Sequence, residues 1–113
     1  MKIIRDKLPL FENPISLIIS SRQDFIKFIF RVCKDKIKLS GLDVGYFYID
    51  NGINVYVWLL PQKKEEMLLC LIHESIHVLF DAAKCRDIKH CKKSEEFFAY
   101  FVEKLVEKFI KRM

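Results

Sequence analysis

The sequence predicts an α+β fold in a single domain, residues 1–113, with a small mixed or antiparallel sheet packed on three helices. Short runs rich in β-branched and aromatic residues alternate with longer runs of helical apolar spacing. The pair Asn51-Gly52 separates two of the β-rich runs, as a hairpin turn would. A chain of 113 residues can form one core, and no linker divides it. The expected order of elements is β, α, β, β, α, α.

The first strand is expected over residues 15–20 (ISLIIS), directly after Pro14. A helix should follow, because the apolar residues then recur at helical spacing and Ser21 is a suitable N-cap residue. The residues expected on one apolar side of this helix are Phe25, Ile26, Ile29, Phe30 and Cys33.

Residues 45–61 (GYFYIDNGINVYVWLLP) predict a β-hairpin that turns at Asn51-Gly52 and ends at Pro61. Proline cannot donate a backbone hydrogen bond, so the second strand is a plausible sheet edge with which an extended peptide could pair. Tyr56 and Trp58 would share one face of that strand. Ordinary packing within the sheet is the alternative interpretation for Trp58.

Two more helices complete the predicted fold, over residues 63–84 and from Ser94 to about Arg112. Ser94 is the expected N-cap of the last helix, and the two glutamates that follow it suit the positive end of the helix dipole. The apolar arc of the last helix contains Phe98, Phe101, Val102, Leu105 and Phe109.

The composition favours a cytoplasmic globular protein without membrane attachment. Lysines spread along the chain contribute to a net charge of +5, and without an arginine-rich or aromatic-interleaved strip a nucleic-acid partner is not expected. The first 14 residues contain charges and proline where a signal peptide needs an unbroken apolar stretch. Free thiols are expected in that compartment for Cys33, Cys70, Cys85 and Cys91.

Residues 69–82 (LCLIHESIHVLFDA) place two histidines and a glutamate in an apolar helix. His73 and His77 are one turn apart and about 40° apart around the helix axis, so both imidazoles can reach one metal ion. Glu74 lies beside this pair, about 100° around the axis from His73. Two neutral nitrogens that hold zinc and a carboxylate that takes a proton from water are what metal-assisted hydrolysis requires. Glu66, Cys70 and Asp81 fall on the same side of the helix.

A catalytic zinc site usually has a third protein ligand, and the sequence offers several candidates. Asp81 is about 12 Å along the helix axis from the first histidine, too far to join the pair but able to orient His77. Cys85, His90 and Cys91 could form a separate structural zinc site, although unbound thiols are the simpler interpretation.

Glu95 and Glu96 are the remaining candidates, provided that the last helix folds back and its first turn meets the histidines. Apolar periodicity puts Glu95 nearer the buried side of that helix. Glu96 instead has the small residue Ala99 on its own side, which would let the two helices approach closely, with Tyr100 beside it. The residues by themselves leave both glutamates open.

The segments HESIH (73–77) and EFFAY (96–100), with 18 residues between them, resemble the gluzincins. These are zinc peptidases that hold the metal with two motif histidines and a glutamate on a following helix. The layout also resembles small phage-type metallopeptidases, in which a strand ending in WLP precedes the motif helix; here that strand is YVWLLP (56–61). The resemblance covers residues 44–110.

The resemblance implies a minimal zincin-like fold, with His73, His77 and Glu96 as zinc ligands and Glu74 as the general base. Glu95 stays the alternative third ligand. The implied function is a zinc-dependent metallopeptidase that hydrolyses peptide bonds through a zinc-bound water, acting in the host cytoplasm if the chain is phage-encoded.

A second electrophile is usual in such a mechanism, and Tyr100 or His90 is the expected residue. The partner would then be a peptide or protein substrate. The competing interpretation is a zinc-binding regulator or protein-interaction module that uses the same scaffold and cleaves nothing.

Overall fold

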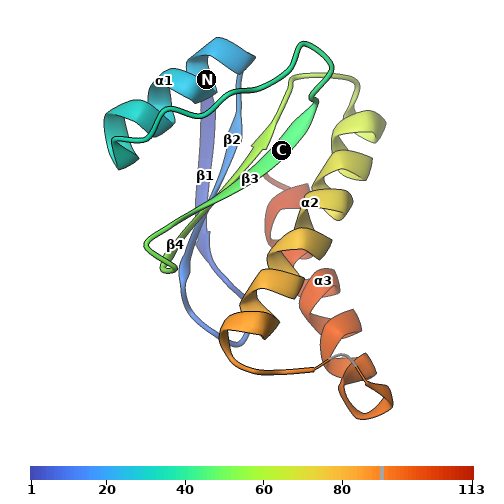
Figure 1. The fold of residues 1–113 in the computed structure, drawn as a ribbon. Helices are drawn as coiled ribbons and strands as arrows, with labels where there is room; N and C mark the ends of the chain where they lie inside the picture. Colours follow the sequence, from blue (N-terminus) through green and yellow to red (C-terminus); the bar gives the residue numbers. More distant parts are fainter. Residues whose placement is uncertain (90) are drawn as a thin grey trace.

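The computed structural model describes residues 1–89 and 91–113. A mixed sheet forms the centre of the molecule, and helices cover both of its faces (Figure 1). The α+β prediction is confirmed. The strands are β1 (Lys2–Lys7), β2 (Pro14–Ile19), β3 (Gly45–Asp50) and β4 (Asn54–Leu59), and the helices are α1 (Arg22–Cys33), α2 (Lys64–Cys85), the short 3-10 helix η1 (Lys92–Ser94) and α3 (Glu95–Ile110).

Strand β1 precedes the first element that the sequence predicts. It pairs antiparallel with β2, from Lys2 opposite Ile19 to Lys7 opposite Pro14. Its sequence, KIIRDK, alternates poorly and carries four charges, which explains why apolar periodicity does not reveal it. Pairing with β2 and burial of Ile4 compensate for this weak local signal.

The strand order β1-β2-β4-β3 places β4 inside the sheet. β4 pairs in parallel with β2 and antiparallel with β3, so the expectation that the strand before Pro61 is a sheet edge is wrong. Pro61 lies two residues after the end of β4 and therefore removes no hydrogen bond from the strand. The two edges are β1 and β3, and β3 lies on the side of α2 (Figure 1).

The hairpin between β3 and β4 turns where the sequence predicts. Asn51 and Gly52 have φ angles of 54° and 69°, and positive φ at both central positions is what a type I′ turn requires. The backbone N–H of Ile53 donates to the carbonyl of Asp50 at 3.0 Å, which closes the turn.

Helix α1 begins as predicted, because the Ser21 hydroxyl accepts a hydrogen bond from the backbone N–H of Asp24. Its buried residues are Phe25, Phe28 and Ile29. Phe30, which the sequence places on the apolar side, is instead 48% exposed. The helix packs on the sheet through the ring of Phe25, which stacks on Trp58 at 5.7 Å between centroids, and this rotation turns Phe30 outward.

The two faces of the sheet carry separate cores. On one face, Ile18 and Trp58 pack against α1. On the other, residues of β2 and β4 pack against α2 and α3, with Phe101, Leu105 and Phe109 of α3 fully buried. Alternation along each strand sends successive side chains to opposite cores. Tyr56 and Trp58 do share a face, and Trp58 packs there with 0% exposure.

Helix α3 folds back along α2, so its first turn lies near the end of α2 (Figure 1). The Ser94 hydroxyl makes no capping hydrogen bond to α3; it accepts from the N–H of Cys91 and donates to the carbonyl of Lys89. Ser94 is therefore at the predicted cap position but closes the preceding turn instead. Among the described residues, no helix is long and apolar enough to cross a membrane.

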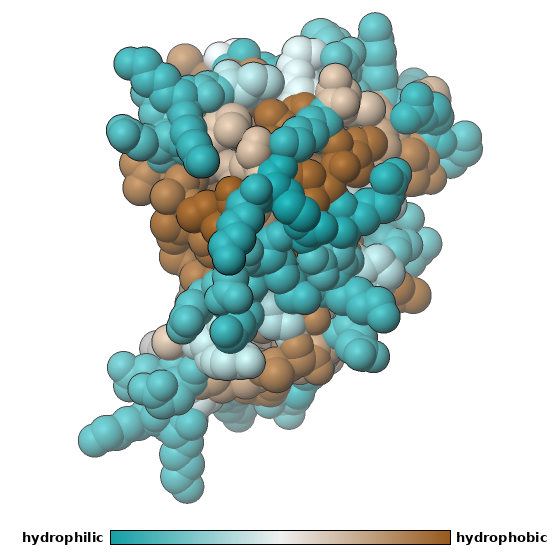
Figure 2. Space-filling model, turned by 180° about the vertical axis from the view of Figure 1, so that it is seen from behind, coloured by the Kyte–Doolittle hydropathy of each residue, from teal (hydrophilic) through white to brown (hydrophobic). Residues whose placement is uncertain are grey.

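Hydrogen bonds and ion pairs connect the first strand with the last segment of the chain at the back of the molecule. Asp6 of β1 accepts hydrogen bonds from Lys108 of α3, at 3.0 Å, and from Arg112, two residues beyond the end of α3. β1 and α3 are the distant elements of Figure 1, and the view from behind shows hydrophilic side chains crossing the middle of the molecule between hydrophobic patches (Figure 2). Asp6 thus joins an edge strand to the last helix.

Candidate functional site

Helix α2 carries the motif histidines on the side that faces the edge strand β3. His73 and His77 are both exposed, and their Nε2 atoms are 3.2 Å apart. Two nitrogens bound to one tetrahedral zinc ion, each at about 2.05 Å, would be about 3.3 Å apart. The i and i+4 positions therefore bring the two rings to the separation that a shared metal ion needs. With neutral rings, the same distance allows one N–H to donate to the other nitrogen.

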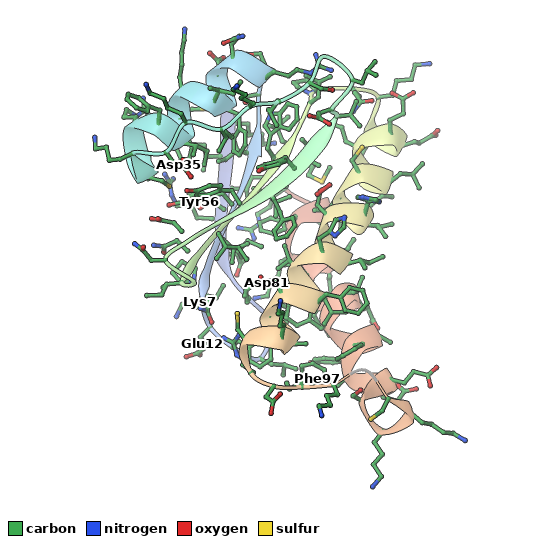
Figure 3. All side chains as sticks on the ribbon, in the orientation of Figure 1. Lys7, Glu12, Asp35, Tyr56, Asp81 and Phe97 are labelled. Atoms are coloured by element: carbon green, nitrogen blue, oxygen red, sulfur yellow. The ribbon has the colours of Figure 1, made fainter. Side chains whose placement is uncertain are left out.

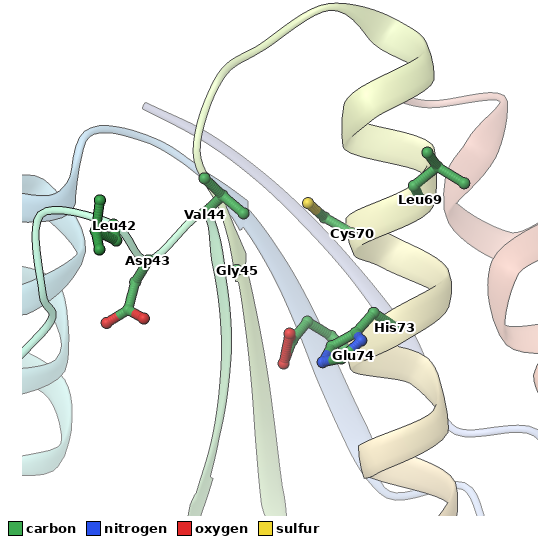
Figure 4. Close-up of a pocket in the computed structure, with 8 residues that line it drawn as sticks. All are labelled: Leu42, Asp43, Val44, Gly45, Leu69, Cys70, His73 and Glu74. Carbon is green, nitrogen blue, oxygen red and sulfur yellow. The ribbon is translucent and has the colours of Figure 1, made fainter.

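Glu74 lies beside His73, between α2 and β3 (Figure 4), and is only 6% exposed. Among the described residues, no hydrogen bond reaches its carboxylate. Burial raises the pKa of Glu74 above its ordinary value of 4.5, whereas the charged forms of His73 and His77 lower it and Asp43 raises it further. The carboxylate is thus poised to hold a proton more readily than a solvated glutamate.

Strand β3 makes room for this carboxylate at Gly45. A Cβ atom added to Gly45 would lie 3.2 Å from Oε2 of Glu74, closer than ordinary van der Waals contact. Any larger residue would push the Glu74 side chain away from the strand. The absence of a side chain at this position therefore helps to set where the carboxylate lies.

Phe47, two residues further along β3, orients one of the histidines. Its ring stacks on the His77 ring, with 5.5 Å between centroids and 9° between planes. The His73 ring meets His77 edge-on, at 4.8 Å and 73°. An aromatic neighbour on a strand restricts the rotation of an otherwise exposed imidazole, which reduces the entropy cost of holding a ligand in one orientation.

A pocket of about 380 Å³ opens beside His73 and Glu74 (Figure 4). The start of β3 and the residues before it form one wall, and α2 forms the other (Figure 4). Exposed apolar residues continue along α2 on the histidine side, where Leu69 is 67% and Ile76 40% exposed. The residues that line the pocket are Leu42, Asp43, Val44, Gly45, Leu69, Cys70, His73 and Glu74.

The structure does not bring Glu95 or Glu96 to the histidines. Both lie exposed in the first turn of α3. Over residues 1–89 and 91–113, no three His, Cys, Asp or Glu side chains form a group that could hold a metal ion. His73 and His77 are therefore a pair in this structure, and the third ligand stays a prediction.

The other sequence candidates lie apart from the pair. Asp81 accepts a hydrogen bond from Sγ of Cys85 at 3.8 Å, so the contact found for it is with its own helix and not with His77 (Figure 3). Tyr100 is 46% exposed, and the ammonium group of Lys104 lies 5.5 Å from its ring centroid. The prediction for His90 falls outside the described residues. The expectation of free thiols is confirmed for all four cysteines.

Gly45 and Phe47 are the functional candidates that the sequence reasoning missed. The run GYFYID alternates, and the register of β3 puts Gly45, Phe47 and Ile49 on one face. The available signal for these two residues was a small residue followed, two positions later, by an aromatic one on the face toward the motif helix. It could be interpreted only once β3 was known to lie against α2.

No protein family model, curated protein or solved structure matches this chain. The geometry of the site therefore has to support any functional conclusion by itself.

Proposed function

We propose that the chain is a zinc-dependent peptidase in which His73 and His77 hold the metal and Glu74 acts as the general base. The observation that carries the proposal is the 3.2 Å separation of the two Nε2 atoms, next to a buried glutamate that faces a pocket. Imidazole nitrogens are among the ligands that zinc prefers, so the donor set fits this metal.

Zinc bound at the histidines would polarise a substrate carbonyl and make a water molecule a strong nucleophile near neutral pH. Glu74 would take the proton of that water and pass it to the leaving amine. Its raised pKa suits both halves of the transfer, because a group that ionises nearer neutral pH can accept a proton and release it again. Phe47 would keep the His77 ring in its binding orientation.

The third ligand would come from α3, with Glu96 favoured by its place in the EFFAY segment and Glu95 as the alternative. This role requires the carboxylate to leave the solvent-facing position that it has in this structure. Competition with a chelator distinguishes the two residues. Loss of zinc in Glu96→Ala alone supports the gluzincin ligand set, and equal affinity in both variants rejects it.

The substrate would be a peptide in extended conformation. β3 is the sheet edge beside α2, so a peptide that paired with it would pass His73 and the pocket. The exposed apolar residues of α2 would border its path. β3 therefore replaces β4 as the strand with which a peptide could pair, because β4 already pairs on both sides.

The test compares wild type, Glu74→Gln and His73→Ala/His77→Ala for zinc content and for cleavage of a peptide library. We expect about one zinc per chain in wild type and Glu74→Gln, none in the histidine variant, and cleavage by wild type only. Cleavage that persists in Glu74→Gln contradicts the assigned base. If zinc binds but no peptide is cut, the regulator or interaction module becomes the better interpretation.

A further inference from the structure

The exposed side of α1 and the segment that follows it border another, open recess, far from α2. After α1 the chain turns and runs back along the helix (Figure 1). The recess has a volume of about 360 Å³ and is lined by Ile26, Lys27, Phe30 and Lys36, which we call the α1 surface. Its lining combines an aromatic ring and an aliphatic side chain with two ammonium groups.

Phe30 is exposed here without a role in either core. Its side chain is 48% exposed, whereas Phe25 and Ile29 on the opposite side of α1 are fully buried against the sheet. The ammonium nitrogen of Lys36 lies 5.9 Å from the centroid of the Phe30 ring, so a cation covers part of the ring. An apolar floor beneath movable lysines is accessible to a partner.

The region around this recess holds most of the net charge of the chain. Residues 22–38 contain six basic and two acidic residues, which accounts for four of the five net positive charges. One of the two acids, Asp35, accepts a 2.6 Å hydrogen bond from the hydroxyl of Tyr48 on β3. Lys27, Lys34 and Lys36 are all exposed. A positive rim therefore surrounds the apolar floor.

We infer that the α1 surface binds a protein segment in which an apolar side chain stands between acidic residues. A recess of this volume accommodates an apolar side chain, and the lysines would pair with the flanking carboxylates. This complementarity concerns a surface separate from the pocket at His73, so it does not depend on zinc or on hydrolysis.

Two other anionic partners fit the surface less well. A helix that lies in a membrane interface buries a broad apolar face in the lipid, but the main apolar face of α1 is already packed on the sheet. Single-stranded nucleic acids are held by aromatic rings on which successive bases stack, and Phe30 is the aromatic residue among the four that line the recess.

The test selects 12-residue peptides from a random display library on wild-type protein and measures the binding of an enriched, fluorescein-labelled peptide. We expect enriched sequences to share an apolar residue flanked by Asp or Glu. Lys27→Glu/Lys36→Glu and Phe30→Ser should each weaken binding tenfold or more. The control Lys92→Glu/Lys93→Glu makes the same charge change on η1, at the far end of the molecule, and should alter binding less than twofold.

Selection of peptides without acidic residues, no enrichment at all, or equal binding by Lys27→Glu/Lys36→Glu would overturn the inference. Vesicles with 30% phosphatidylserine and a 20-nucleotide single-stranded RNA are tested in parallel. Tighter binding to either one than to the peptide, lost in Lys27→Glu/Lys36→Glu, would assign the surface to that partner instead. Zinc content, which should be unchanged in this variant, separates its outcome from that of the His73 site.

Discussion

The two faces of the sheet each bury a polar side chain beneath a helix, but only one of these side chains has a hydrogen-bond partner. On the α1 face, Trp58 is fully buried, and its Nε1–H donates to the carbonyl of Ser20 at 3.0 Å. On the α2 face, Glu74 is 6% exposed, and its carboxylate receives no hydrogen bond within the part of the chain that the structure describes.

Burying a polar group without a hydrogen bond costs free energy, and burying a charge costs more. Trp58 avoids this cost and adds a large apolar surface, so its place is explained by stability. Glu74 has no such partner, but its carboxylate oxygens are not fully buried, because Gly45 leaves space for them beside the open pocket. Partial burial still raises the pKa of Glu74, so its ionised form costs the α2 face some stability, and this favours a role in binding or chemistry.

Removal of Trp58, the buried side chain that has a hydrogen-bond partner, should have the largest effect on stability. Trp58→Ala deletes a fully buried ring that stacks on Phe25, and we expect the free energy of unfolding to fall by about 3–5 kcal/mol in urea denaturation. Trp58→Phe keeps an aromatic ring but leaves the Ser20 carbonyl without its donor, and it should lose less. A loss below about 1 kcal/mol in Trp58→Ala would contradict the structural role of this side chain.

Asp6 is a second side chain with hydrogen-bond partners, and because it ionises, its contribution to stability should depend on pH. Burial opposes ionisation of Asp6, but hydrogen bonds from the backbone N–H of Lys7 and from Lys108 and Arg112 outweigh it, so its pKa is lowered from the ordinary value of 3.8. Because the folded-state pKa is depressed, the stabilisation is present above that ordinary value and is lost as the pH falls through the folded-state pKa.

Asp6→Asn should therefore lower the free energy of unfolding by about 1 kcal/mol at pH 7, since its partners lie partly in solvent. The difference from wild type should shrink as the pH falls below 3.8. Thermal denaturation from pH 7 to pH 2.5 measures it. Glu12→Gln, at an exposed residue, is the matched control and should show no such trend. A difference that stays constant with pH would mean that the ion pairs are not its source.

Glu74→Gln should have the smallest effect on stability and the opposite sign. Burial raises the pKa of Glu74, so in chelator-treated protein this group contributes stability below 4.5 that is lost as the pH rises through the folded-state pKa. The neutral amide removes that dependence, and the variant should be as stable as wild type or more so at pH 7. Urea denaturation at pH 5 and pH 7 measures it, and a loss comparable to that of Asp6→Asn would make Glu74 a structural residue.

Features set by neighbours along the chain were predictable. Ser21 caps α1, Asn51-Gly52 forms the turn between β3 and β4, and His73 and His77 meet across one helical turn. Each depends on interactions within about four residues, so periods, caps and turn preferences suffice to predict it. The apolar arc of α3 belongs to the same class, since four of its five predicted members are buried.

Features that depend on the order of the strands were not predictable from local pattern. β1 carries too many charges to stand out, yet it occupies one edge of the sheet, while the parallel pairing of β2 with β4 puts β4 inside. The choice between Phe28 and Phe30 as the buried residue of α1 likewise followed from how the helix meets Trp58.

The sequence by itself determined the types of element, the turn and the spacing of the histidines, because these follow from backbone geometry over a few residues. Tertiary structure alone decided that β3 lies against α2, so that Gly45 faces Glu74 and Phe47 stacks on His77. It also left Glu96 in solvent, a position that no helical period specifies. Such contacts join segments more than 20 residues apart, and their free energy depends on how whole elements pack and not on any local repeat.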